Sequence, residues 1–579
     1  MKNRKNRTTP DAAREAAAVA RQSTGIAWWH YALGLFALLF IAFEVYAPAL
    51  SGPFLYDDSY LPFLIPDVVN QPLKAWLGVR PLLMATYWLN YQTSALEPYA
   101  YHVVGLLFHI LNSILAALIV RRFLEWTGAD GFLRSLLSVF AGALFLLHPI
   151  QTESVAYVAS RSETMSVFFF LTAYLVFVYR KSPAISLGRT ILILLFFAAA
   201  CLTKEHTTVF PLLLLLTDYY FNPGFNFQGI RQNWKLYLPI LLGGAIGVAA
   251  VARVLKNNPA AGFHIKGMTW HDYLFTQFGA VCSYLRLYLL PYGQNVDYDF
   301  PVSHNLWEHG AFIYLILLLA MGFLAWRYQR QYPLASFGFF GALILFAPTS
   351  SVVPIADVLV ERRLYLPFIC LLLITVELLR RWKTSQTTLG FTLAAILAAA
   401  AVLSYQRNHV WHDAIALWAD TAEKSPSKSR PRFQLAFAYF QAGKCQDAIR
   451  EYELTSKLDS ADQRLFIDWA LAYDCAQQPD QALAKLQQAA RIEQNAHVYA
   501  LMGMIHGKRG NNAEALGALE AAEKLDSNFE MTYVYRGNVY LGSGDSAKAA
   551  EQYQRALRIN PANQPAQEGL AIATSKRNR

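Results

Sequence analysis

Residues 103–120 read VVGLLFHILNSILAALIV, a run with no acidic, lysine or arginine side chain. About 20 apolar residues span the hydrocarbon core of a bilayer as a helix, so this run predicts a transmembrane segment. Comparable runs occupy residues 31–46, 136–147, 165–178, 236–251, 311–326, 337–346, 364–378 and 391–403. The chain is 55% hydrophobic, with a mean hydropathy of +0.24. These runs predict an all-α, polytopic membrane domain and argue against the core helices of a large soluble protein.

The net charge of +10 belongs to the first 410 residues, because residues 411–579 contain 20 Lys and Arg against 20 Asp and Glu. The basic residues lie in clusters beside the apolar runs, at positions 2–7, 121–134, 180–189, 231–235, 327–330 and 380–383. This arrangement is the positive-inside pattern of a membrane protein. We therefore expect these clusters in the cytoplasm and expect no nucleic-acid partner.

Placing the clusters in the cytoplasm predicts a topology for residues 28–410, after a cytoplasmic tail of residues 1–27. Eleven crossings result, at residues 28–47, 100–120, 134–148, 163–179, 190–203, 206–220, 236–252, 309–326, 334–348, 363–379 and 389–404. Residues 272–290 carry Asp272 and Arg286, and we interpret them as re-entrant or interfacial. The C-terminal domain then lies outside the cytoplasm.

Residues 411–579 are alanine-rich and repeat at a spacing of about 34 residues. A small residue is followed three positions later by an aromatic or histidine in the pairs Ala436–Tyr439, Ala470–Tyr473, Gly503–His506 and Gly537–Tyr540. An alanine and then a large residue follow each pair: Ala448 and Tyr452, Ala482 and Leu486, Ala515 and Leu519, Ala549 and Tyr553. The pattern predicts about four and a half tetratricopeptide repeats (TPRs), an α-solenoid in which each hairpin buries its apolar face against the next. Such an array binds peptides or proteins on its concave face, or serves as a passive cap.

Two of the five cysteines, Cys445 and Cys475, fall near the inter-helix turns of adjacent predicted repeats. If this domain lies outside the cytoplasm, the two can form a disulfide, whereas in a reducing compartment they would be free thiols. Cys201, Cys282 and Cys370 lie in or beside the apolar runs, where we expect inert core residues.

Charged residues beside apolar segments are costly to place there, so four such groups are candidate site residues. They are Tyr56-Asp57-Asp58, His148 to Glu153 with Arg161 to Glu163, Lys204-Glu205-His206, and Glu361-Arg362-Arg363 running to Pro367. All four fall on the outer side of the predicted topology. Adjacent acids can bind a metal, act as a general base or cap a helix, and the last role alone explains one acid more easily than two.

Together these groups predict a cavity at lipid depth that contains carboxylates, arginines and a lysine. A guanidinium pairs bidentately with phosphate oxygens, and a carboxylate can accept a proton from an incoming hydroxyl. Nucleotide sugars are absent outside the cytoplasm, so a polyprenyl-phosphate sugar is the expected donor.

The ordered set of motifs resembles the TPR-containing transmembrane O-mannosyltransferases of the GT-C glycosyltransferase superfamily, over almost the whole chain. It comprises Phe54-Leu55-Tyr56-Asp57-Asp58, Arg80-Pro81-Leu82, Tyr101-His102, His109, His148-Pro149 to Glu153, Arg161 to Glu163, Lys204-Glu205, Asp297 and Glu361-Arg362-Arg363-Leu364-Tyr365-Leu366-Pro367. The resemblance implies an inverting transfer of a sugar from a polyprenyl-phosphate carrier to a protein Ser/Thr hydroxyl, on the lumenal or periplasmic side.

By this resemblance Asp57 or Asp58 is the catalytic base, with Asp58 favoured as the closer to the following helix. Arg362, Arg363 and Lys204 would bind the carrier phosphate. Supporting or substrate-binding roles fall to Arg80, His102, His148, Glu153, Arg161, Glu205, Glu361 and Tyr365. Cations in this pocket can stabilise the leaving phosphate in place of a metal, and a divalent metal at Asp57 and Asp58 stays open as a cofactor.

The short repeat array departs from the family pattern and favours a bacterial inner-membrane relative, which leaves the sugar open. The expected partners are the lipid-linked donor, membrane lipids and an acceptor protein bound through the TPR groove. Three other functions compete: a membrane-anchored TPR scaffold for envelope or pilus assembly, a flippase for lipid-linked sugars, and a transferase of whole oligosaccharides or onto glycan. A flippase fits least well, because the charged groups cluster on one side.

Overall fold

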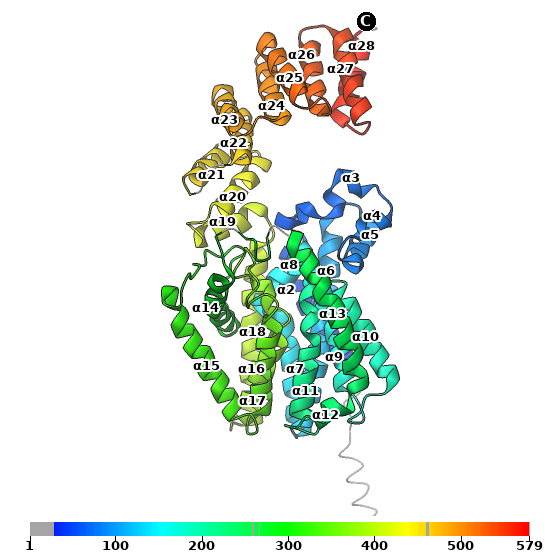
Figure 1. The fold of residues 1–579 in the computed structure, drawn as a ribbon, viewed down its shortest axis with the longest axis vertical. Coiled ribbons are helices and arrows are strands. Elements are labelled where there is room, and N and C mark those ends of the chain that lie inside the picture. Colours follow the sequence, from blue (N-terminus) through cyan, green and yellow to red (C-terminus); the bar gives the residue numbers. More distant parts are fainter. Residues whose placement is uncertain (1–27, 258–259, 266, 459–461, 578–579) are drawn as a thin grey trace, which may run out of the picture. The chain divides into compact units, whose positions relative to one another are not determined.

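The computed structural model describes residues 28–257, 260–265, 267–458 and 462–577. The chain divides into two units (Figure 1). The membrane unit comprises residues up to Gln294 together with Pro301–His412, and the repeat unit comprises Asn295–Phe300 together with residues from Asp413 onward. Within the described residues both units are helical, and the bridge between Ala261 and Ile355 is isolated. The predicted tail of residues 1–27 lies outside the described residues.

Every apolar segment predicted to cross or line the membrane forms a helix. These helices are α2 (Trp28–Leu50), α6 (Pro98–Trp126), α7 (Gly131–Leu147), α9 (Arg161–Val178), α10 (Leu187–Cys201), α11 (Phe210–Phe221), α13 (Trp234–Asn257), α14 (Trp270–Leu289), α15 (Ala311–Arg327), α16 (Pro333–Phe346), α17 (Phe368–Arg381) and α18 (Gln386–Val410). The short α12 (Gln228–Gln232) precedes α13.

Length and composition make five of the described helical segments able to span a membrane by themselves. They are Leu33–Leu50, Pro98–Trp126, Val158–Val178, Glu308–Arg327 and Gln386–Val410. A sixth results if Gly131–Leu147 and Pro149–Ala156, which meet at a 49° bend, count as one span. Leu187–Cys201 and Pro333–Phe346 are apolar but shorter. Helix α14 is not among the helices that are both long and apolar enough to cross a membrane. The chain is therefore a helical membrane protein, while the eleven crossings and their order stay a prediction.

Small residues allow neighbouring helices of the membrane unit to approach closely. A Cβ at Gly142 of α7 would lie 2.8 Å from the Ser113 carbonyl oxygen of α6, and one at Gly338 of α16 would lie 2.5 Å from the Cys370 carbonyl oxygen of α17. Close backbone contact through small residues is how helices associate where lipid removes the hydrophobic driving force.

The segment between α2 and α6 folds onto the membrane unit as a series of short helices. They are η1 (Tyr56–Tyr60), η2 (Pro62–Leu64), α3 (Pro66–Val69), α4 (Leu73–Trp76) and α5 (Pro81–Ser94). Phe63, Trp76 and Tyr87 of this segment are buried against Tyr101 of α6 and Met165 of α9. This apolar contact fixes the position of η1, which carries the paired aspartates.

Five further short elements connect the long helices. They are η3 (Pro149–Gln151), α8 (Thr152–Ala156), η4 (Val158–Ser160), η5 (Glu205–Val209) and η7 (Glu361–Leu364). They carry the other charged groups that the sequence analysis selected. An additional turn, η6 (Glu308–Gly310), precedes α15.

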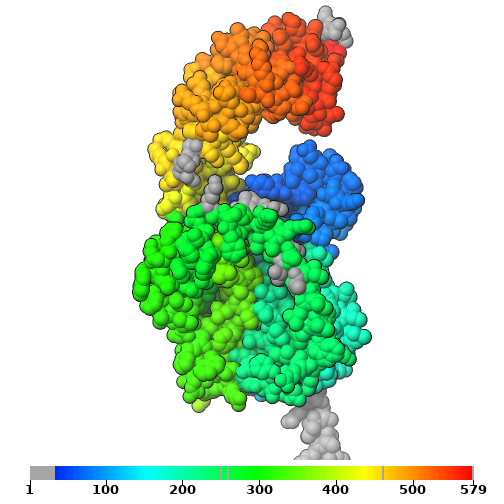
Figure 2. All heavy atoms as spheres, viewed as in Figure 1, coloured from blue at the N-terminus to red at the C-terminus, as the bar shows by residue number. Residues whose placement is uncertain are grey.

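The repeat unit is a succession of helical hairpins in chain order, coloured yellow to red in Figures 1 and 2. Its helices are α19 (Ala414–Lys424), α20 (Ser429–Gln441), α21 (Cys445–Leu458), α22 (Gln463–Cys475), α23 (Pro479–Ile492), α24 (Ala496–Lys508), α25 (Asn512–Leu525), α26 (Glu530–Gly542), α27 (Ser546–Ile559) and α28 (Gln564–Arg577). A Cβ at Gly503 would meet Leu519 at 2.5 Å, and one at Gly537 would meet Tyr553 at 2.7 Å. The predicted pairing of a small with a large residue is confirmed in these two hairpins.

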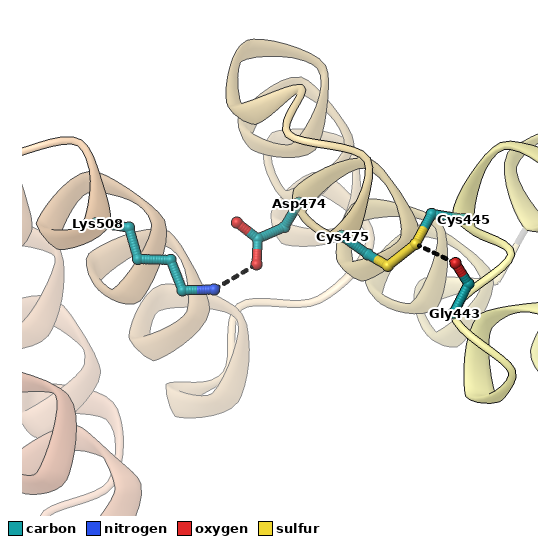
Figure 3. Close-up of a disulfide and its surroundings, with 5 residues drawn as sticks. All are labelled: Gly443, Cys445, Asp474, Cys475 and Lys508. Carbon is teal, nitrogen blue, oxygen red and sulfur yellow. Dashed lines mark hydrogen bonds and ion pairs between the residues drawn. A yellow bond between two sulfur atoms is a disulfide. The ribbon is translucent and has the colours of Figure 1, made fainter.

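Adjacent repeats are also linked covalently. Cys445 at the start of α21 and Cys475 at the end of α22 form a disulfide, with their Cα atoms 5.8 Å apart (Figure 3). Beside it, Asp474 and Lys508 form an ion pair of 2.6 Å between α22 and α24. Cys201, Cys282 and Cys370 are free thiols.

The unit boundary differs from the predicted 410/411 division in two respects. Trp411 belongs to the membrane unit, where it is buried with its ring 6.0 Å from that of Tyr157. Residues 295–300 belong to the repeat unit although they lie between α14 and α15 in the sequence. Their Asp297 pairs with Lys428 and Arg430, two cations of the repeat region that no sequence motif marked.

Candidate active site

The paired aspartates lie in η1, directly after Tyr56, whose φ of 51° is left-handed and costly for a residue with a side chain. Asp58 is buried, and both of its carboxylate oxygens accept backbone hydrogen bonds. Leu55 N–H donates to one at 2.8 Å, and Ala159 N–H donates to the other at 2.7 Å. Asp58 therefore joins η1 to η4.

Burial raises the pKa of Asp58 to about 7. The backbone hydrogen bonds from Leu55 and Ala159 oppose this rise, the charge of Asp57 adds to it, and Arg161 again opposes it. The effect of burial on the pKa of Asp58 therefore outweighs that of the backbone hydrogen bonds, and the carboxyl group is enclosed by the protein.

Asp57 is only partly buried, and its backbone N–H donates a 2.8 Å hydrogen bond to the Tyr157 hydroxyl. The guanidinium carbon of Arg362 lies 5.8 Å from the centroid of the Tyr157 ring. Tyr157 therefore connects the first aspartate to the arginine across about 300 residues of sequence. Two of the residues that the sequence analysis expected in one place, Asp57 and Arg362, thus both contact this tyrosine.

Arg362 is held by Glu153 of α8. The Glu153 carboxylate accepts the Arg362 backbone N–H at 3.0 Å and forms an ion pair with the guanidinium at 2.5 Å. Within the described residues the Nε and Nη2 groups of Arg362 make no hydrogen bond, and 21% of the side chain is exposed. These N–H groups can therefore still donate to a phosphate oxygen.

Two other cations complete the cluster. Lys204 forms an ion pair with Glu163 and lies 3.4 Å from the Ser162 hydroxyl, and Arg80 pairs bidentately with Glu205 at 2.8 and 3.0 Å. Burial lowers the pKa of Lys204, Glu163 opposes this, and the charges of Arg80 and Arg362 lower it further. The three cations therefore share one electrostatic environment.

Other predicted site residues support the cluster from inside the protein. The His102 ring lies 3.2 Å from the Gly52 carbonyl oxygen, and the His148 ring lies 3.0 Å from that of Tyr288. Arg161 is buried, donates to the Thr86 hydroxyl and the Tyr101 carbonyl, and lies over the Tyr87 ring at 4.4 Å. These contacts position backbone segments around η1 and η3.

Three residues of the predicted Glu361–Pro367 motif also have protein partners. Arg363 donates to the carbonyl oxygens of Asp357 and Val358, so its guanidinium is used in shaping its own loop. Tyr365 is fully buried and bonded to His109 and Asn112. Glu361 is buried and accepts a hydrogen bond from Gln294.

Two residues central to this arrangement were missed by the sequence analysis. Tyr157 lies inside the marked stretch between Glu153 and Arg161, but a tyrosine between apolar residues carries no signal by itself. Gln294 follows α14 and stands in no motif. Only contacts across the fold identify either residue.

The sequence analysis left a metal site open at Asp57 and Asp58. Within the described residues, no group of three or more His, Cys, Asp or Glu side chains could hold a metal ion. Both oxygens of Asp58 already accept backbone hydrogen bonds.

The fold and site define the class of this protein: a helical membrane protein with a buried cluster of charged residues and a C-terminal solenoid of helical hairpins. The tetratricopeptide-repeat family profile matches residues 531–563. The chain is 24% identical over 562 residues to Protein O-mannosyl-transferase TMTC3 of Homo sapiens, covering 85% of this chain and 58% of the relative. It is 23% identical over 463 residues to Protein O-mannosyl-transferase F38B6.6 of Caenorhabditis elegans, covering 73% of this chain and 62% of the relative.

The resemblance to TPR-containing transmembrane O-mannosyltransferases is thus confirmed. The homologues of this chain are named protein O-mannosyl-transferases. The chain spans 58% of the length of the human relative. Among solved structures, MamA is 21% identical, with a TM-score of 0.23, and the match covers 25% of this chain and 81% of that one.

Proposed function

We propose that this protein is an inverting glycosyltransferase that moves a sugar from a polyprenyl-phosphate carrier to a Ser or Thr hydroxyl of a protein, on the outer side of the membrane. The observation that carries the proposal is the succession of Asp57, Tyr157 and Arg362. The backbone N–H of Asp57, a partly exposed residue, and the guanidinium of Arg362, which has unused N–H groups, both contact Tyr157, and this supports the proposal. The names of the homologues support the reaction class.

The reaction is one displacement at the anomeric carbon of the sugar. A carboxylate of η1 accepts the proton of the acceptor hydroxyl as that oxygen forms its bond to the anomeric carbon. The bond from this carbon to the phosphate oxygen breaks, and its electron pair leaves with the polyprenyl phosphate. Arg362 and Lys204 stabilise the negative charge that develops on the departing phosphate.

Among the two aspartates we propose Asp57 as the base and Asp58 as its positioning residue. The sequence favoured Asp58, but both oxygens of that carboxylate are occupied by backbone donors inside the fold. A base must reach a substrate hydroxyl, and Asp57 is the more accessible of the two. Arg363 is likewise reassigned from phosphate binding to loop positioning, because backbone carbonyls accept its N–H groups.

The proposed partners and location follow from the same residues. The TPR array would bind the acceptor protein, as solenoids bind peptides along a concave face. The disulfide between Cys445 and Cys475 supports a repeat unit in an oxidising compartment, which agrees with a periplasmic location in a bacterial inner-membrane protein. The proposed reaction needs no metal.

A transfer assay tests the proposal. Purified full-length protein is incubated with a panel of polyprenyl-phosphate sugars and a Ser/Thr-rich protein acceptor, and the product is identified by mass spectrometry. We expect one donor sugar to be transferred with inverted configuration, with full activity in the presence of EDTA. Transfer by Asp57→Asn at the wild-type rate would refute the proposed chemistry and favour the scaffold function.

A further inference from the structure

Gln294 occupies a place that connects the two halves of the proposed phosphate site. It is buried, and its side-chain amide donates to the Pro149 carbonyl at 2.9 Å and to the Glu361 carboxylate at 2.8 Å. Pro149 opens η3, which continues into the helix that carries Glu153, and Glu361 opens η7, which carries Arg362. The side chain of Gln294 thus bonds to both segments that carry the ion pair between Glu153 and Arg362, namely η3 with α8 and η7.

The residues that follow Gln294 in the chain belong to the repeat unit. Asp297 is buried, and its carboxylate pairs with Lys428 at 2.5 Å and with Arg430 at 2.5 and 2.6 Å. The Ser425 hydroxyl donates to the Asp297 carbonyl at 2.6 Å and accepts from the Asn295 side-chain amide at 2.7 Å. Residues 295–300 are therefore bound by polar contacts to the start of the repeats.

Only two residues lie between Gln294 and Asp297, about 10 Å of fully extended chain. The backbone from the anchored carboxylate to the tie between η3 and η7 therefore has little freedom. If the repeat unit displaces Asp297, the two intervening residues transmit that displacement to Gln294.

We propose that the repeat unit, by holding residues 295–300, fixes Gln294 and thereby sets the affinity of the donor site for a polyprenyl phosphate. Gln294 is a positioning residue that acts through Glu361 and Arg362, and Asp297 is its anchor. This inference rests on the proposed function, because it assumes that Arg362 binds the carrier phosphate. It adds that the repeats contribute to donor binding as well as to acceptor binding.

The test measures binding of a sugar-free polyprenyl phosphate to the purified full-length protein by isothermal titration. Gln294→Ala and Asp297→Asn should each raise the Kd about three- to tenfold, the size of one lost hydrogen bond. Lys428→Ala, which leaves Arg430 on Asp297, should give a smaller change in the same direction. Because Arg362 also stabilises the departing phosphate, kcat at saturating donor should fall in the same variants.

A matched control separates this effect from a general loss of repeat stability. Glu523 also binds two cations, Arg536 and Arg555, each at 2.6 Å, in the repeat unit but far along the chain from residue 294. Glu523→Gln should bind the polyprenyl phosphate like the wild type. The double variant Gln294→Ala/Asp297→Asn should bind no more weakly than Gln294→Ala, because both changes act along one path.

The outcomes distinguish this inference from the proposed function. Wild-type protein that fails to bind polyprenyl phosphate would overturn both. Wild-type binding with unchanged Kd in Asp297→Asn and Lys428→Ala would overturn the inference alone. So would effects of Gln294→Ala and Asp297→Asn that multiply, or an equal loss of affinity in Glu523→Gln.

Discussion

Glu153 and Arg362, 209 positions apart in the sequence, are bound to each other by two contacts, one through the Arg362 guanidinium and one through its backbone N–H. Glu153 is almost fully buried, whereas Arg362 keeps a fifth of its side chain exposed. The carboxylate therefore orients the arginine without using all of its hydrogen-bond donors. This division of roles leads to a prediction for each partner.

Arg362→Ala should both abolish polyprenyl-phosphate binding and destabilise the protein. Removing one partner of a buried ion pair leaves the other charge uncompensated, which costs about 3–5 kcal/mol. The double variant Glu153→Gln/Arg362→Met removes both charges, so it should recover most of the lost thermal stability without recovering binding. Thermal unfolding and titration of the two proteins check this, and recovery of binding in the double variant would contradict a phosphate role for Arg362.

Asp57→Asn and Asp58→Asn should fail in different ways. Loss of a general base lowers kcat by about 10²- to 10⁴-fold, so Asp57→Asn should lose turnover while its Tm stays near that of wild type. In Asp58→Asn the amide nitrogen faces a backbone N–H, which leaves a buried donor unpaired at a cost of about 1–3 kcal/mol. A lower Tm is therefore expected for Asp58→Asn. Equal Tm losses in the two variants would contradict this assignment.

The stability contributed by Asp58 should depend on pH. Its pKa is about 7 in the folded protein and about 3.9 in an unfolded chain. Between these values the folded state binds the extra proton, so stability falls as pH rises and levels off above pH 7. The Tm of wild type minus that of Asp58→Asn should thus shrink from pH 5 to pH 8. A difference that grows with pH would show that the folded carboxyl has a lowered pKa.

The helices of the membrane unit could be predicted from the sequence because an apolar run and its flanking charges are local features. The repeats could be predicted because Ala436, Gly503 and their equivalents recur in register with the large residues they contact. The number of crossings could not be settled in the same way, since α10 and α16 are apolar but shorter than a bilayer span.

The sequence indicated which residues belong to the candidate site, but it could not indicate what each of them does there. Charges such as Asp57, Glu153 and Arg362 stand out because each is costly beside an apolar segment. Sequence could not show that Asp58 is enclosed by backbone donors, because one donor, Ala159, lies 101 positions away. Gln294 was unpredictable for a related reason: an uncharged residue after a helix is ordinary until its two partners are known.

The disulfide of the repeat unit gives a prediction that does not depend on the chemistry of the site. Closing a loop with a sequence separation of 30 residues stabilises a folded domain by about 3–4 kcal/mol through the entropy of the unfolded chain. Cys445→Ser/Cys475→Ser should therefore lower the unfolding temperature of the repeats, and Cys445→Ser alone should lower it equally. Cys370→Ser, which changes a free thiol in the membrane unit, controls for the loss of a cysteine.

The same bond tests on which side of the membrane the repeats lie. If they face an oxidising compartment, a thiol reagent added to unreduced, unfolded protein from the native membrane should label Cys201, Cys282 and Cys370 and spare Cys445 and Cys475. Peptide mapping by mass spectrometry without reductant would then recover the two cysteines in one linked pair. Full labelling of all five thiols would place the repeats in a reducing compartment, and the acceptor hydroxyl could then not be an extracytoplasmic one bound along them.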